Sequence, residues 1–410
     1  MRLTRGTLVG LLVSGGLVAV GVSSAQAAPN PCAGATIVGT DQDDVLRGTD
    51  GPDVIDGLAG DDTLFGLGGD DVLCGGYGQD ELQGGDGADV LHGGRDAKVQ
   101  EDSDYYVYYG DSLEGGPGDD TLDPGLDSRH EGSVDAVTFE HSLGPVTVDL
   151  ALGSATGDGT DTFTGPFTRV TGTPYDDVLL GSDGRETLAG GRGSDRLEGR
   201  GGDDDLAGRD LSFHRGWNHV DRDVVLGGAG NDYVAGGNGD DLLRGGRGND
   251  SLNGDRGVDR SYGGPGKDNF VDLLESADGQ VMAGGPGVDN LYDLHLYDAD
   301  GRYQRHSVGR IDLAAGTFRA RFGGTTTRVS VPGNEGAGTP RGDLWTVYGT
   351  DGPNQLISGY DDPVRLFGLG GRDSLFGSIR DDVIDGGPGY DSGTGYTGHD
   401  RIISMEKIYR

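Results

Sequence analysis

The sequence predicts an all-β solenoid, in which short strands stack in layers around a narrow core. Glycine-rich turns restart every nine residues over much of the chain. An aspartate follows the first glycine of most units by five residues, and an aliphatic residue follows that aspartate by two. Helical periodicity is almost absent beyond the N-terminal segment. A nine-residue unit cannot bury an apolar face alone, so its neighbours must stack on it.

The N-terminal segment is predicted to be a secretory signal peptide over residues 1–27. Arg2 and Arg5 precede an apolar or small-residue stretch from Leu8 to Val22, and Ala25-Gln26-Ala27 supplies a small-x-small cleavage site. The alternative is a buried N-terminal helix. No other stretch approaches the roughly 18 to 20 apolar residues of a membrane helix. We therefore expect a secreted chain without a membrane span.

The composition is strongly acidic and poor in apolar residues. There are 69 acidic and 32 basic residues, giving a formal net charge of -37. Charge repulsion therefore makes nucleic acids and anionic membranes poor candidates as partners. Only 33% of residues are hydrophobic and 84 are glycine, a composition close to that of disordered chains. Divalent cations are the expected source of stability, because they would neutralise the acidic charge.

The repeats form four arrays, separated by two segments that lack the nine-residue period. Residues 28–125 hold the first array and a tyrosine-rich insertion, and residues 126–171 form a non-repeat β segment. The second and third arrays occupy residues 172–292. A second non-repeat β segment spans residues 293–358, before the fourth array and a C-terminal cap at residues 359–410.

The interruptions are expected to be loops that bulge from one continuous stack. After Gly93-Gly94-Arg95 the chain inserts the tyrosine-rich segment, then resumes with Asp111-Ser112-Leu113-Glu114. The insertion after Gly208-Arg209 ends in the same way and contains His214 and His219, interpreted as solvated loop residues. The run of tyrosines from Tyr105 to Tyr109 predicts packing over the roll edge, with a sugar-contacting patch as the alternative.

The two non-repeat segments resemble each other. Val148-Asp149-Leu150-Ala151-Leu152-Gly153 matches Ile311-Asp312-Leu313-Ala314-Ala315-Gly316. Alternating apolar residues such as Val146 and Val148 are typical of half-buried strands. We therefore expect both segments to continue or space the stack.

One unit, written GGxGxDxUx with U aliphatic, has the chemistry of a calcium turn. Its first six residues must turn sharply, which glycine allows, and the last three form a strand with U pointing inward. Two units make one circuit, so aspartates 18 residues apart stack on one edge. Carboxylate and carbonyl oxygens between two layers suit Ca²⁺, which takes six to eight oxygen ligands, better than Mg²⁺.

This unit resembles the RTX (haemolysin-type) calcium-binding nonapeptide repeat, and the resemblance covers most of the chain after the signal peptide. It implies a parallel β-roll with Ca²⁺ bound between successive turns. It also implies a set of metal ligands at the sixth position of the units. These ligands are Asp44, Asp53, Asp62, Asp71, Asp80, Asp89, Asp120, Asp177, Asp195, Asp204, Asp232, Asp241, Asp250, Asp259, Asp268, Asp289, Asp373, Asp382, Asp391 and Asp400.

Some units depart from the pattern. Glu186 replaces an aspartate, and its pairing with Asp204 is not expected to match that of the other units. The sixth position is Asn354 in one unit and Val364 in another, so these turns are expected to hold an ion weakly or not at all.

The two cysteines, Cys32 and Cys74, are expected to form a disulfide between the chain start and the fourth repeat. Two unpaired thiols are the alternative. A zinc site is not expected, because no histidine lies in ligand spacing.

The leading functional hypothesis is a secreted calcium-binding protein of structural or adhesive role, disordered at low calcium and folded outside the cell. Cell-surface or matrix glycans and proteins are the candidate partners beyond calcium. The sequence contains neither His-Glu-x-x-His nor Gly-x-Ser-x-Gly, so protease and lipase signatures are missing, and we expect no enzymatic activity. The alternative is a polysaccharide-active or other enzyme that carries the repeats.

Overall fold

A computed structural model describes residues 31–95, 98–102, 105–108, 110–125, 134–209, 221–274, 279–297, 303–322, 325–358 and 362–409. The predicted signal peptide lies outside these residues, as do His214 and His219. So do the side chains of the tyrosine run. The described residues form 40 strands and no helix, so none of them forms a helix that could span a membrane.

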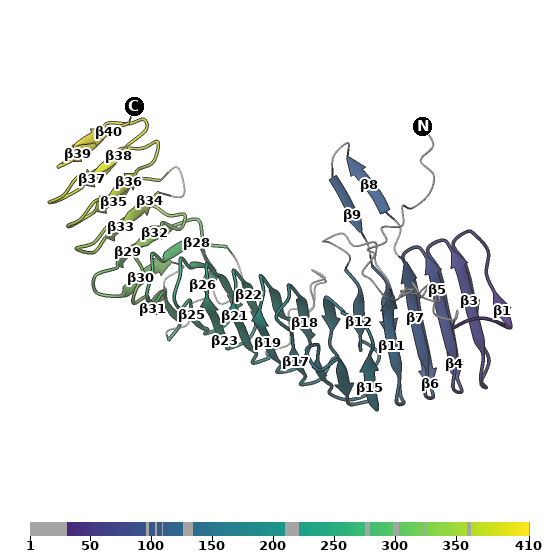
Figure 1. Cartoon of the computed structure of the whole chain (residues 1–410). Coiled ribbons are helices and arrows are strands. Elements are labelled where there is room, and N and C mark those ends of the chain that lie inside the picture. Colours follow the sequence, from purple (N-terminus) through teal and green to yellow (C-terminus); the bar gives the residue numbers. More distant parts are fainter. Residues whose placement is uncertain are drawn as a thin grey trace, which may run out of the picture.

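Two large sheets run side by side along the molecule, and their strands alternate along the chain in the repeat arrays (Figure 1). The 21-stranded sheet, called sheet A, contains β1 (Ile37–Val38), β3 (Val54–Ala59), β5 (Val72–Tyr77), β7 (Val90–Arg95), β11 (Thr121–Gly125), β13 (Thr147–Asp149), β14 (Ser154–Thr156), β15 (Thr160–Phe163), β17 (Val178–Leu180), β19 (Arg196–Gly201), β21 (Val224–Ala229), β23 (Leu242–Arg247), β25 (Arg260–Tyr262), β27 (Val281–Ala283), β29 (Ser307–Asp312), β30 (Thr317–Phe322), β31 (Thr325–Ser330), β33 (Leu344–Tyr348), β35 (Val364–Phe367), β37 (Val383–Asp385) and β39 (Arg401–Ile403).

The second sheet, called sheet B, faces sheet A across the core. It contains β2 (Val45–Arg47), β4 (Thr63–Gly68), β6 (Glu81–Asp86), β10 (Ser112–Glu114), β12 (Ala136–Thr138), β16 (Arg169–Thr171), β18 (Thr187–Gly191), β20 (Asp205–Arg209), β22 (Tyr233–Asn238), β24 (Ser251–Arg256), β26 (Asn269–Leu274), β28 (Asn290–Leu296), β32 (Gly336–Gly338), β34 (Gln355–Ile357), β36 (Ser374–Phe376), β38 (Ser392–Thr394) and β40 (Lys407–Ile408). Its strands pair in parallel from layer to layer, as β4 does with β6.

The eighteen-residue circuit predicted from the sequence is confirmed by the strand register. Ile55 of β3 pairs with Leu73 of β5, and Leu73 pairs with Leu91 of β7. The aliphatic residue at the eighth position of the unit points inward, and these three side chains are fully buried. Each layer therefore contributes one or two apolar side chains to a core that runs the length of the stack.

Both swollen turns leave the stack intact, as predicted. After the first insertion, β10 pairs in parallel with β6. After the second, β21 pairs with β19. The first insertion itself contains the hairpin of β8 (Lys98–Asp102) and β9 (Tyr105–Tyr108), which projects from the stack (Figure 1).

The two non-repeat segments share one structural device, an antiparallel meander of three strands within sheet A. In the first, β15 pairs with the preceding β11, and β14 and β13 lead on to β17. In the second, β31 pairs with the preceding β27, and β30 and β29 lead on to β33. The matching sequence segments end β13 and β29 and begin the following turns, so their resemblance reflects this shared role.

The meanders give sheet A more strands than sheet B, and the stack curves accordingly. Sheet A is longer on its side of the core, so the molecule bends toward sheet B. Figure 1 shows this bend near β28 and β32, with β30 and β31 on the outer side. The concave side is therefore formed by sheet B.

Cys32 and Cys74 form a disulfide with Cα atoms 6.2 Å apart. The bond joins the start of the described chain to β5, so it ties the first layers together. The prediction of a bridge from the chain start to the fourth repeat is confirmed.

Candidate metal sites

The predicted ligands stack in two rows, one along each edge where the chain crosses between the sheets. Asp44 precedes a strand of sheet B, and Asp53 precedes a strand of sheet A. Asp62 lies one layer beyond Asp44, and its Oδ1 atom accepts a hydrogen bond from the Asp44 backbone N–H at 2.8 Å. The Asp71 carboxylate accepts from Asp53 in the same way.

This backbone-to-carboxylate bond recurs along both rows. Of the 20 predicted aspartates, the 18 beyond Asp44 and Asp53 each accept such a bond through Oδ1 from the preceding layer. The structure therefore brings the predicted pairs together. It differs from the expectation in one respect, because the layers are linked by a carboxylate and a backbone N–H rather than by two carboxylates facing each other.

The second carboxylate oxygen points back toward the first glycine of its own unit. A Cβ atom built on Gly57 would lie 2.4 Å from Oδ2 of Asp62 and 2.6 Å from the carbonyl oxygen of Gly75 in the next layer. Gly227 has the same surroundings, formed by Asp232 and Gly245. The missing side chain thus leaves a space that a carboxylate oxygen and a carbonyl oxygen both border.

In one class of turn, which we call the open turn, this second oxygen has no protein partner. The second residue of an open turn has a positive φ and is mostly glycine, with Leu58 and Arg200 among the exceptions. Its N–H donates to a carbonyl of the next layer, as Gly85 does to Gly115 at 2.9 Å. Among the described residues, Oδ2 is buried without a hydrogen-bond partner in Asp62, Asp71, Asp89, Asp120, Asp195, Asp204, Asp232, Asp241, Asp250, Asp259, Asp268, Asp289, Asp373 and Asp391.

In the other class, which we call the hydroxyl-closed turn, the second residue is threonine or serine. Thr173 donates its N–H to Oδ2 of Asp177 at 2.6 Å and its hydroxyl to Oδ1 at 2.9 Å. Ser378 makes the equivalent bonds to Asp382. The same closure is made by Thr40 with Asp44, Thr49 with Asp53, and Ser182 with Glu186. Thr350 likewise donates its N–H to Oδ1 of Asn354, but its hydroxyl accepts a hydrogen bond from the Asn354 amide.

Burial makes the aspartates of the open turns costly to ionise. It raises the pKa of Asp195 to about 8 and that of Asp241 to about 7, and neighbouring carboxylates add to both shifts. The pKa of Asp250 rises to about 6 for the same reason. A buried carboxylate that lacks a counter-charge destabilises the fold, so these rows require protons or cations.

Sequence reasoning missed several residues that occupy the same rows. Asp111, Asp135 and Asp223 accept the layer-to-layer hydrogen bond although they lie outside an intact nonapeptide. Each stands two residues before a buried aliphatic side chain, so an Asp-x-aliphatic search would have found them. Asp161 also accepts such a bond, but it lies in the first meander and carries no repeat signal.

Glu186 joins its row despite its longer side chain. Its backbone N–H donates to Oδ1 of Asp204 at 2.9 Å, so the two layers are linked as elsewhere. Its own carboxylate is held by Ser182. The expected irregularity thus affects the glutamate side chain and not its backbone link to Asp204.

The open turns fit a hard cation that is held by oxygen. The described residues contain no cluster of three or more His, Cys, Asp and Glu side chains suited to a metal ion. Open turns such as those of Gly57 and Gly227 instead offer one unpartnered carboxylate oxygen beside a glycine carbonyl oxygen. Oxygen ligands in flexible, partly main-chain sites suit Ca²⁺, whereas zinc prefers nitrogen and sulfur.

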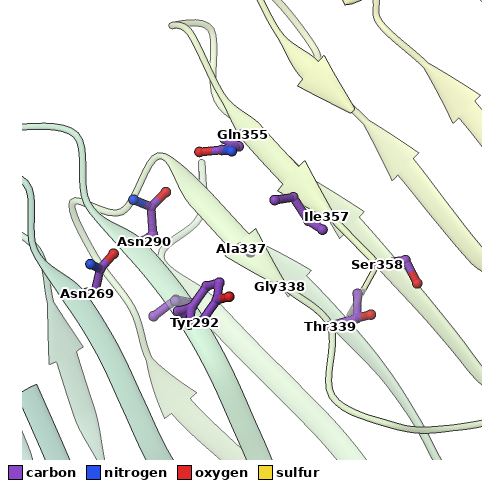
Figure 2. Close-up of a pocket in the computed structure, with 10 residues that line it drawn as sticks. Asn269, Asn290, Tyr292, Ala337, Gly338, Thr339, Gln355, Ile357 and Ser358 are labelled. Carbon is purple, nitrogen blue, oxygen red and sulfur yellow. The ribbon is translucent and has the colours of Figure 1, made fainter. Parts of the chain in front are cut away.

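A second feature, on the concave side of the bend, is an uncharged groove of about 580 Å³. Asn269, Asn290 and Gln355 contribute amides from β26, β28 and β34 of sheet B, and Tyr292 contributes a ring that is 60% exposed. Figure 2 shows Asn269, Asn290 and Tyr292 on one side of Ala337 and Gly338, and Gln355 and Ile357 on the other. None of its ten lining residues is charged, in contrast to the acidic chain as a whole.

The chain matches one family model, described as RTX calcium-binding nonapeptide repeat (4 copies). The matched segments are residues 38–73, 75–97, 109–128, 169–197, 180–210, 221–243, 235–270 and 367–402. Together they cover about half of the chain and include all the predicted ligands except Asp289. No curated protein matches the sequence.

Proposed function

The chain belongs to the family of RTX calcium-binding nonapeptide repeats, and on this premise we propose a secreted protein that folds on binding Ca²⁺ outside the cell and then serves as a structural or adhesive rod. One observation carries the proposal. Fourteen buried carboxylate oxygens, repeated from layer to layer, have no hydrogen-bond partner among the described residues. A fold with so many unpartnered anionic groups depends on an added cation.

The residues of an open turn have separate roles in such a site. Oδ1 of the aspartate fixes the carboxylate by accepting the N–H of the preceding layer, and Oδ2 is left for the ion. The first glycine admits the ion because a side chain there would fill the space between the two oxygens. Bound Ca²⁺ supplies positive charge that neutralises the rows and offsets the burial of the carboxylates.

Two observations support export. The disulfide of Cys32 and Cys74 is of a kind that persists in oxidising surroundings outside the cytosol. The acidic rows would repel one another at the low calcium concentration inside a cell, which would keep the chain unfolded before export. The predicted signal peptide provides the route.

The adhesive role is supported by the curved shape and the uncharged groove. The stack is bent, with β28, β32 and β34 of sheet B on the inner side of the bend (Figure 1), and the groove lies on these strands. The amide groups can hydrogen-bond to the hydroxyl groups of a neutral sugar, and the exposed tyrosine ring beside them can stack on the face of that sugar. Glycans or proteins of a cell surface or matrix are therefore the partners we propose beyond calcium.

Circular dichroism of the chain without its signal peptide, recorded with chelator and with millimolar Ca²⁺, tests the folding part of the proposal. At a pH of about 8, where the buried carboxylates are largely ionised in the absence of the ion, we expect β structure to form only with calcium. Equal β content in the two conditions would contradict calcium-dependent folding.

We propose that the protein has no enzymatic activity. One observation supports the alternative of a polysaccharide-active enzyme. A second groove, of about 470 Å³, is lined by Glu81, Glu114, Glu140 and His141. The buried Glu114 carboxylate contacts His141 Nδ1 at 2.8 Å and raises the pKa of that histidine. Release of reducing ends from a panel of polysaccharides, lost in Glu114→Gln, would favour this alternative.

A further inference from the structure

The repeat pattern breaks at Asp272, in a way that adds a second carboxylate to one turn. Asp272 stands eighteen residues after Gly254, at the position where the next layer elsewhere has a glycine. It lies beyond the segments matched to the family model. The register of β26 against β28 shifts between Phe270 and Asp272, so the backbone is irregular at this point.

The Asp272 side chain occupies the place that a backbone carbonyl has in open turns such as those of Gly57 and Gly227. A Cβ atom built on Gly254 would lie 2.5 Å from Oδ2 of Asp259 and 2.8 Å from Oδ2 of Asp272. At Gly227 the corresponding second oxygen is the carbonyl of Gly245. Two carboxylates from different strands therefore converge over one glycine.

Both carboxylates are buried, and each keeps an oxygen without a protein partner. Asp259 is 0% exposed and Asp272 is 1% exposed. Oδ2 of Asp259 and Oδ1 of Asp272 have no hydrogen-bond partner among the described residues. Gln280, which is also buried, donates through Nε2 to Oδ2 of Asp272 at 2.6 Å and so fixes its position.

The protein cations described in this region do not neutralise the pair. Arg209 forms its ion pair with Asp255, at 2.8 Å. Burial and the nearby Asp272 carboxylate raise the pKa of Asp259 to about 9. Two like charges in so enclosed a place are strongly unfavourable unless a cation lies between them.

We propose that Asp259 and Asp272 form a two-carboxylate divalent-cation site, positioned by Gln280, that binds Ca²⁺ more tightly than the ordinary open turns. The inference rests on the proposed calcium function and adds a site that the nonapeptide pattern does not contain. Two formal negative charges balance the two positive charges of the ion, whereas an ordinary turn offers one carboxylate oxygen and a carbonyl. Affinity in protein calcium sites rises with the number of charged ligands.

Calcium titration of the full chain against a chromophoric chelator tests this site. We expect one ion to bind at least about tenfold more tightly than the others, because of the extra charged ligand. Asp272→Gly restores the glycine of the repeat, and Asp272→Asn keeps the shape of the side chain. Both variants should lose the tight ion and keep the weaker ones, with the same β content as the parent at saturating calcium.

Asp351→Asn is the matched control, since Asp351 is exposed and lies in a hydroxyl-closed turn. It should leave the tight ion unchanged. A tight ion that persists in both Asp272 variants would overturn the inference, as would a parent chain whose ions all bind with one weak affinity. Binding of no calcium at all by the parent chain would overturn the proposed function as well, so the two failures are distinguishable.

Discussion

At the scale of the residue, the second residue of each turn decides whether both oxygens of the sixth-position carboxylate are hydrogen-bonded within the protein. Where that residue is threonine or serine, its N–H and hydroxyl bind the carboxylate, as Thr173 binds Asp177. Where it has a positive φ, the carboxylate in most turns keeps an unpartnered oxygen, as in Asp62 and Asp232. Four of the predicted ligands, Asp44, Asp53, Asp177 and Asp382, belong to the first class, and the first two of them open the first array. We infer that ion binding is concentrated in the open turns.

Asparagine substitutions in the two classes should therefore have different effects. Asp250→Asn preserves the acceptor for the Asp232 N–H but removes the charge that faces the ion. We expect one bound Ca²⁺ fewer, and a loss of about 1.4 kcal/mol in the free energy of unfolding when free calcium is ten times Kd. Asp177→Asn, in a hydroxyl-closed turn, should leave the number of ions unchanged. Calorimetric stoichiometry checks both, and an equal loss of ions in the two variants would contradict the distinction.

At the scale of the element, the first glycine of a turn is required for the space that it leaves. Gly227→Ala would place a Cβ 2.4 Å from Oδ2 of Asp232 and 2.6 Å from the Gly245 carbonyl oxygen. We expect loss of that ion and destabilisation of the calcium-loaded chain by about 1 to 3 kcal/mol, as in overpacked sites. Gly144→Ala is the control, because nothing lies within 4 Å of its added Cβ.

Chemical denaturation in saturating calcium measures both glycine variants. Similar stability of Gly227→Ala and Gly144→Ala would show that the turn can expand, and would contradict the role given to the first glycine.

The meanders show why a sequence likeness between two segments can be informative without a repeat period. The segments that end β13 and β29 are similar because the two strands have the same role. Each is the first strand of an antiparallel meander, pairing with β14 or β30, and each also pairs in parallel with a later strand, β17 or β33. The strands themselves were predictable from alternating apolar residues. Their antiparallel order was not, because it depends on which earlier and later strands they meet.

At the scale of the whole molecule, the formal charge of -37 and the buried rows make folding depend on whatever neutralises the carboxylates. Protons can take that role in part. Burial raises the pKa of Asp89 and Asp120 to about 7 and of Asp223 to about 8, all above the ordinary value of 3.8 for an aspartate. At pH values between the ordinary aspartate pKa and these raised pKa values, the folded chain binds more protons than the unfolded chain. The stability of the folded chain therefore falls as the pH rises through this range.

Calcium-free chain should therefore gain β structure when the pH is lowered from about 8 to about 5, within the window of these shifts. Circular dichroism in calcium-free buffer checks this. With calcium present the effect of acid should reverse in sign, because protons compete with the ion for the same oxygens and lower its affinity. Loss of β structure on acidification without calcium would contradict the claim that protonation of the buried aspartates stabilises the calcium-free fold.

The overall curvature also belongs to this scale. Each meander adds strands to sheet A alone, and the stack bends toward sheet B (Figure 1). The uncharged groove of Asn269, Tyr292 and Gln355 lies on the concave side that results (Figure 2). A surface that is suited to a partner thus arises from an interruption of the repeat rather than from the repeat.

The nine-residue period by itself determined the parallel stacking, the inward aliphatic residues and the two rows of aspartates, because a strict period places equivalent residues at equivalent positions in every layer. The tertiary structure decided what the period does not encode. It placed Asp111, Asp135 and Asp223 in the rows across long insertions, since row membership requires only that the residue precede a strand of the stack. It also brought Asp272 over Gly254, because carboxylates that are distant along the chain can converge only after the layers have stacked.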